Sequence, residues 1–102
     1  MPHRKQWPKT VEEAVEQLLS SMSEEYKEAL KNTPDEDLIL HHYGFGAYIR
    51  NEFGLWDNNK ELLKSCGLQL YPDSPYNEYL PMMVHPDNAS TKIIEATWRR
   101  PQ

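Results

Sequence analysis

The residues best suited to bind a ligand are concentrated between positions 41 and 56, in the stretch HHYGFGAYIRNEFGLW. An arginine guanidinium can bind a carboxylate or a phosphate through two parallel hydrogen bonds, and a tryptophan offers a flat face for stacking. Histidine and asparagine add hydrogen-bonding groups beside them. These residue types favour a small anionic ligand such as a nucleotide. The candidate ligand-binding residues are His41, Arg50, Asn51, Trp56 and, from the C-terminal end of the chain, Arg99.

Two glycines in this stretch require an explanation, because a glycine inside a helix costs about 1 kcal/mol relative to alanine. Either another helix packs closely over the bare backbone of Gly44 and Gly46, or that backbone admits a ligand. Arg50 also has two interpretations. It lies one turn before the expected end of a helix, where it can stabilise exposed carbonyls, or it can bind a carboxylate or phosphate.

The two adjacent histidines do not form a usual metal-binding pair. Neighbouring residues on a helix point about 100° apart, so His41 and His42 cannot ligate one metal as an i, i+4 pair does. His42 lies on the apolar side of the expected helix and is interpreted as a structural histidine bonded to a backbone carbonyl. A metal-dependent enzyme would have to combine His41 with His85 and Asp87, a spacing that matches no known metal site. We therefore expect no metal, no cofactor and no catalytic residues.

The second candidate site is the proline- and tyrosine-rich stretch 68–84, LQLYPDSPYNEYLPMMV. Its three prolines argue against a continuous helix, and it is longer than most connections in compact domains. Tyrosine and methionine suit protein interfaces, because they bury a large area while tolerating nearby water. The alternative is that the stretch packs back onto the domain and enlarges a thin core. The candidate partner-binding residues are Tyr71, Tyr76, Tyr79, Met82 and Met83.

Length and charge limit the classes of function. A chain of 102 residues with 38% apolar residues and a net charge of −5 is expected to form one folded domain with a thin core. Nine acids but only two lysines lie between positions 11 and 37, and this face would repel phosphate backbones, so general nucleic-acid binding is not expected. No apolar run reaches the roughly 20 residues of a membrane span. The single cysteine, Cys66, suits a reducing compartment. We expect a cytoplasmic protein, in the host cytoplasm if the gene is from a phage.

Capping patterns predict where the first helices begin and end. Thr10 and Ser23 are typical N-cap residues, each followed by glutamates in the first helical turn. A third helix is predicted to begin at Thr33-Pro34 and to continue through Phe53, because an apolar side chain recurs every three or four residues. Gly54 is predicted to end it in the left-handed conformation.

The remaining signals predict two further helices and no strand. Asn58 and Glu61 form a capping box for a fourth helix that is expected to stop at Gly67. A last helix is predicted from Asp87 or Asn88 until Pro101 ends it. The expected fold is therefore all-α, a single domain of about five short helices over residues 10–100. A flexible arm over residues 1–9 would precede it, and the long loop over residues 68–86 would lie inside it.

Four motifs resemble a family of small bacterial domains that is classed only as a domain of unknown function. They are WPKT at 7–10, DLILHHYGFGAYIRNEFGLW at 37–56, NKELLKSCG at 59–67 and DNASTKIIEATW at 87–98. Together they cover most of the chain, and the stretch 68–84 is the part without a counterpart. The resemblance implies a bacterial or bacteriophage source. It implies no activity, because none is assigned to the family.

The sequence thus supports two functions of different classes. The leading hypothesis is a non-catalytic protein-binding module, such as an inhibitor, an immunity protein or a regulatory subunit. Its partner would be another protein, met by the acidic helices and the stretch 68–84. The alternative is a protein that binds or sequesters a small anionic ligand.

Overall fold

The computed structural model describes residues 7–100, and this part of the chain is helical without any strand. The expected all-α class is confirmed, and no helix in this range is long and apolar enough to cross a membrane. The elements, in chain order, are α1 (Val11–Ser21), α2 (Glu24–Lys31), the 3-10 helix η1 (Asp35–His41), α3 (Phe45–Glu52), α4 (Lys60–Leu70), the 3-10 helix η2 (Asn77–Tyr79), α5 (Leu80–Met83) and α6 (Pro86–Arg99).

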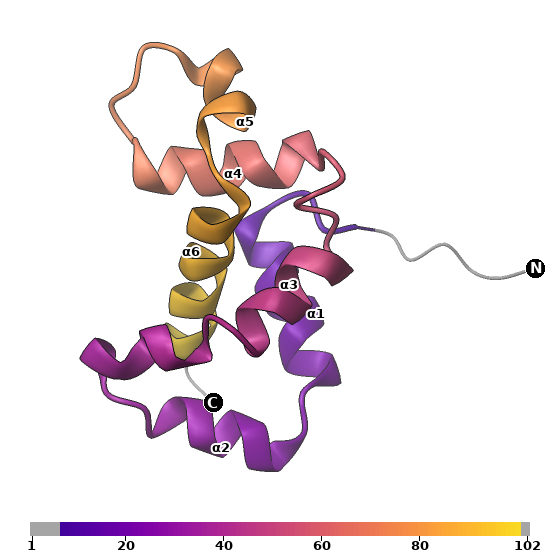
Figure 1. Ribbon diagram of the computed structural model, residues 1–102, viewed down its shortest axis with the longest axis vertical. Coiled ribbons are helices and arrows are strands. Elements are labelled where there is room, and N and C mark those ends of the chain that lie inside the picture. The colour runs from indigo at the N-terminus through magenta and orange to yellow at the C-terminus, as the bar shows by residue number, and fades with distance from the viewer. Residues whose placement is uncertain (1–6, 101–102) are drawn as a thin grey trace, which may run out of the picture.

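Helix α6 is the centre of the fold (Figure 1). It packs against α1, α2, α3, α4 and η1, and Figure 1 shows α4 crossing one end of it while α2 lies near the other. Its buried residues recur at helical spacing, so one side of the helix faces the core. These residues are Ala89, Ser90, Ile93, Ile94 and Thr97.

The first two helix starts agree with the sequence-based prediction. The Thr10 hydroxyl accepts a hydrogen bond from the Glu13 backbone N–H at 3.1 Å, and the Ser23 hydroxyl accepts one from Tyr26 at 3.1 Å. Each bond satisfies one of the donors that a helix start leaves without an intrahelical partner.

The end of α3 also agrees with the prediction. Gly54 has φ +68°, and the Leu55 N–H donates to the Arg50 carbonyl at 3.0 Å. This is the long hydrogen bond of a Schellman ending. Leu55 is buried as a result, so the helix ending also supplies a core side chain.

The single third helix predicted from Thr33-Pro34 to Phe53 is wrong in its first half. The chain forms η1, turns over residues 42–44, and begins α3 as a separate helix at Phe45. Thr33 does not cap η1, since its hydroxyl donates to the Ala29 carbonyl instead. The break falls at Gly44, a residue type with little tendency to continue a helix.

Helix α4 differs from its prediction at both ends. Its N-cap is Asn59 and not Asn58, and it continues past Gly67 to Leu70. The helix continues through Gly67. The missing side chain of Gly67 makes room for another element that packs against α4. A β-carbon added there would lie 3.0 Å from side-chain atoms of both Leu80 and Val84.

Asn59 also holds the N-terminal segment against the domain. Its side-chain amide donates to the Pro8 carbonyl at 3.1 Å and to the Phe53 carbonyl at 2.9 Å, and Pro8 is fully buried. Pro8, which lies in the expected flexible arm, is therefore packed on the domain. Residues 1–6 of that arm lie outside the described residues.

The expected long loop contains helical turns. Pro81 occupies the first turn of α5, where a missing N–H costs little. The last helix begins slightly earlier than predicted, with His85 as its N-cap in place of Asp87 or Asn88. The His85 Nδ1 accepts a hydrogen bond from the Asp87 N–H at 3.0 Å.

Cys66 lies inside the core and is expected to be chemically inert in the folded protein. Its side chain is fully buried, and its S–H donates to the Ala89 carbonyl at 3.6 Å. Burial raises the pKa of the thiol to about 12, although the charge of Lys92 acts in the opposite direction. Because the thiolate is the reactive form, a disulfide reagent should label Cys66 at near-neutral pH only when the protein unfolds.

The same shift predicts an alkaline loss of stability. Between pH 9 and about 12 the thiol of the unfolded chain has lost its proton while the folded thiol keeps it. The contribution of Cys66 to stability is thus complete below pH 9 and falls as the pH rises through this window.

Labelling of Cys66 by the disulfide reagent, measured across a denaturant series, tests whether the thiol is buried. Rapid labelling of the folded protein in native buffer would contradict the burial.

Candidate functional site

His41 forms a structural bridge between α2 and η1. The Thr33 hydroxyl gives its one proton to the Ala29 carbonyl at 2.8 Å, so it accepts a hydrogen bond from Nε2 of His41 at 3.0 Å. Nδ1 of His41 is then the acceptor for the Tyr26 hydroxyl at 2.6 Å. Both ring nitrogens are therefore used within the fold, in the Nε2-protonated tautomer.

Arg50 faces a carboxylate of its own chain. Its guanidinium donates to the Ser90 hydroxyl at 2.9 Å and to the His42 carbonyl at 3.3 Å, and its Nε lies 3.5 Å from the Asp87 carboxylate. The Arg50 side chain is 9% exposed. A buried guanidinium needs such partners. The structure supplies them from Ser90, His42 and Asp87, and not from the helix-end carbonyls expected from the sequence. Arg50 thus joins α3 to the first two turns of α6.

The two mid-stretch glycines have different surroundings. A β-carbon at Gly46 would lie 2.9 Å from Nη1 of Arg50 and 3.6 Å from Ile94, so close packing of α6 and Arg50 explains this glycine. At Gly44 no atom lies within 4 Å of the added carbon, so close packing does not explain that glycine.

The other candidate ligand-binding residues lie elsewhere on the surface. Asn51 is exposed, and the Trp56 ring meets the His85 ring edge-on with centroids 5.6 Å apart. Arg99 lies 4.0 Å from Glu95. The described contacts do not bring these residues together with His41 and Arg50 around one cavity.

Arg99 does line an open basic pocket of about 340 Å³ at the end of α6, together with Lys92 and Arg100. The cations there have acidic neighbours: Lys92 contacts Glu95 at 3.0 Å, and Arg100 contacts Glu16 at 3.1 Å. An anion would have to compete with these carboxylates, so the ion pairs in this pocket disfavour anion binding.

The residues of the metal hypothesis are not assembled into a metal site. Within residues 7–100, no group of three or more histidine, cysteine, aspartate or glutamate side chains could hold a metal ion. His41 contacts Tyr26 and Thr33, whereas His85 and Asp87 contact each other at 3.8 Å.

The stretch 71–84, which we call the strap, has an inward and an outward face. Leu80 and Val84 are buried, and they pack over Gly67 of α4. The tyrosine and methionine side chains remain on the outside, and Met82 is 80% exposed. The strap thus both adds to the core and presents an apolar surface. The exposed residues are Tyr71, Tyr76, Tyr79, Met82 and Met83.

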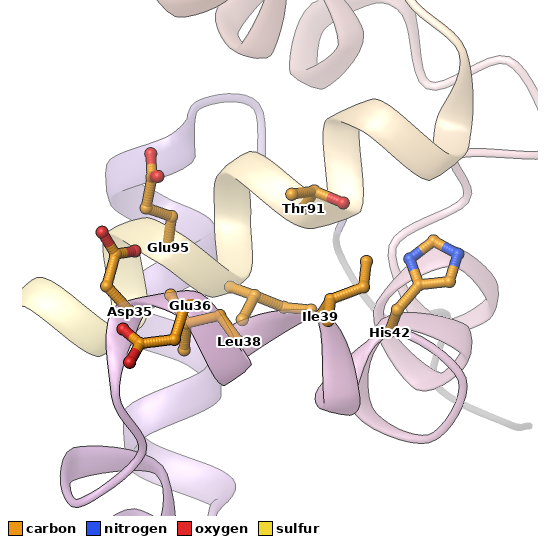
Figure 2. A pocket seen from close by; sticks show the side chains of 8 residues that line it. Asp35, Glu36, Leu38, Ile39, His42, Thr91 and Glu95 are labelled. Carbon is orange, nitrogen blue, oxygen red and sulfur yellow. The ribbon is translucent and has the colours of Figure 1, made fainter.

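A groove of about 200 Å³ lies between η1 and α6. Figure 2 shows carboxylates gathered at one end of it and the imidazole of His42 at the other, with Leu38 and Ile39 between them. The residues that line this η1–α6 groove are Asp35, Glu36, Leu38, Ile39, His42, Thr91, Ile94 and Glu95.

His42 differs from its predicted role as a carbonyl-bonded core histidine. It is half-buried, and its Nδ1 is buried without a hydrogen-bond partner among the described residues. The break after η1 explains the difference, because it turns His42 toward the groove and leaves the His42 carbonyl to accept from Arg50.

Sequence reasoning missed the η1–α6 groove because the predicted helix ran through it without a break. One signal was present in the sequence. Three acids, Asp35 to Asp37, are followed directly by Leu38, Ile39 and Leu40, and six such residues cannot all be accommodated on the two sides of one amphipathic helix.

These features define a small all-α domain in which several short helices surround a C-terminal one. The chain belongs to a family described as a domain of unknown function, DUF6794, whose model matches residues 7–100. This range includes the strap, which the four quoted motifs did not cover. No curated protein and no solved structure matches the chain.

Proposed function

We propose that this domain is a non-catalytic protein-binding module whose partner docks on the outward face of the strap. The observation that carries the proposal is the arrangement of the strap itself. Five tyrosine and methionine side chains are exposed within 13 positions, beside two side chains that are buried in the core.

The anchoring of the strap favours binding over a purely structural role. A single exposed apolar side chain is ordinary, but a cluster of them is typical of interaction surfaces. Because Leu80 and Val84 already fix the segment, a partner would not have to order it, and less binding free energy would be lost on association.

The charge of the domain favours a basic partner. The chain carries a net charge of −5, and α1 and α2 each have two acids in their first turn. Such a surface accelerates encounters with a positively charged protein and disfavours acidic ones. An inhibitor, an immunity protein or a regulatory subunit in the cytoplasm of a bacterium or of a phage-infected cell would have these properties.

Site-specific photo-crosslinking tests the proposal. A benzoylphenylalanine placed at Tyr79 should give one defined adduct in the source cell, whereas the same group at Tyr48 on α3 should not. The purified partner should then bind Tyr76→Ser/Met82→Ser about tenfold or more weakly. It should bind Tyr48→Ser, which also loses one exposed tyrosine, with unchanged affinity.

The same experiment can contradict the proposal. Identical adducts from Tyr79 and Tyr48 would indicate non-specific capture. An affinity unchanged by the double substitution in the strap would exclude the strap as the docking face.

A further inference from the structure

The η1–α6 groove combines two kinds of surface in a fixed order. Leu38 and Ile39 form an apolar stretch, and the carboxylates of Asp35, Glu36 and Glu95 lie beyond one end of it (Figure 2). Ile94 adds a further apolar side chain to the lining of the groove. A lysine or arginine side chain has the same order of properties, because a flexible hydrocarbon stem ends in a cation. The groove therefore matches a basic side chain better than an anion or a fully apolar group.

The acidic end retains uncompensated charge. Glu95 contacts Lys92 at 3.0 Å, but within residues 7–100 no basic group lies within ion-pair distance of Asp35 or Glu36. Two neighbouring carboxylates without a cation make the local electrostatic potential more negative. A cation that enters the groove would find these two groups available.

Exposed apolar side chains lie on η1 and on the turn after it, next in the chain to residues that line the groove, and they favour a polypeptide over a small cation. Ile39 is 62% exposed, Leu40 74% and Tyr43 85%. These residues follow one another along η1 and the turn after it. A free amino acid or a polyamine would leave them uncovered, whereas a peptide segment with apolar residues beside its basic residue would cover them.

His42 lies at the end of the groove opposite the carboxylates (Figure 2), and its side chain is not the most stabilising choice there. The buried Nδ1 of His42 has no hydrogen-bond partner among the described residues, and an unpaired buried polar atom is destabilising. An apolar residue of similar size would avoid this destabilisation. Such a departure from the most stable choice is characteristic of functional surfaces.

From the order of apolar and acidic groups, we propose that the η1–α6 groove is a second docking site that binds an arginine or lysine side chain from a basic, apolar segment of a partner protein. The stem of that side chain packs on Leu38 and Ile94, and its cation pairs with Asp35 and Glu36. This inference goes beyond the proposed function, because it rests on the groove and not on the strap.

A peptide titration followed by amide NMR spectra tests the proposal on the whole chain. The probe is acetyl-Gly-Leu-Arg-Leu-Gly-amide, compared with the same peptide in which uncharged citrulline replaces arginine. Saturable shifts are expected for the amides of η1 and for those near Thr91 and Ile94, with arginine only. Binding should weaken about tenfold in Asp35→Asn/Glu36→Gln, as two ion pairs are lost, and it should weaken with added salt.

A matched variant separates the groove from general charge. Glu25→Gln/Glu28→Gln removes the same number of charges from exposed positions of α2 and should leave peptide binding unchanged. Circular dichroism confirms the fold of both variants.

Three results would overturn the proposal: no saturable shifts with the arginine peptide, equal binding of the citrulline peptide, or equal weakening in the α2 variant. If spermidine binds as tightly as the arginine peptide, the ligand of the groove is a free polyamine and the proposal of a polypeptide ligand is wrong. None of these results bears on the strap, whose test uses the purified partner.

Discussion

Replacing Gly54 by alanine is expected to lower the free energy of unfolding by about 3 kcal/mol or more. Two independent penalties add here. Gly54 has φ +68°, a conformation that costs roughly 1–2 kcal/mol for a residue with a β-carbon. That carbon would also lie 2.3 Å from the Trp7 ring, so the ring would have to leave its place.

Chemical denaturation followed by circular dichroism measures this effect. Gly44→Ala is the matched control, because no atom lies within 4 Å of its added carbon. Its φ of −91° is open to any residue, so this variant should be as stable as the parent protein or slightly more stable. Equal losses in both variants would refute the explanation.

Replacing Leu80 by alanine is expected to cost about 2–5 kcal/mol, the usual range for a fully buried leucine. Leu80 is 0% exposed and packs against α4 at Gly67. Because it is one of two side chains that anchor the strap, its truncation should also release the strap. Limited proteolysis at the strap should therefore accelerate more than global unfolding alone predicts.

Met82→Ala is the control for the strap. Met82 is two positions away but 80% exposed, so its truncation should change the free energy of unfolding by less than about 0.5 kcal/mol. A strap that remains resistant to protease in Leu80→Ala would mean that other contacts fix it.

The features that could be predicted from the sequence depend on neighbouring residues. Thr10 and Ser23 bond to N–H groups three residues away, and Gly54 ends α3 through a bond that spans five residues. The apolar side of α6 likewise follows from spacing alone. Such short-range rules are sufficient to predict the all-α class.

The features that could not be predicted depend on distant residues. From the sequence, Gly67 is predicted to end a helix. In the structure Leu80 and Val84 pack over it, and this contact explains why a glycine is present there. From the sequence, Arg50 is a candidate residue for binding an anion. Its partners Asp87 and Ser90 lie on α6, about 40 positions away, and no local pattern predicts these contacts. The η1–α6 groove likewise exists only because η1 and α6 meet, and no local pattern records that contact.

The central position of α6 has a consequence for biosynthesis. Residues 86–99 contact α1, α2, α3, α4 and η1, so each of these elements buries part of its apolar side only after α6 has been made. Without α6, a nascent chain retains the elements that meet directly, such as α4 with α1 and α5, and we expect it to expose the apolar surface that α6 would cover. We therefore expect folding during translation to be completed only after α6 has left the ribosome, with apolar surface accessible to chaperones until then.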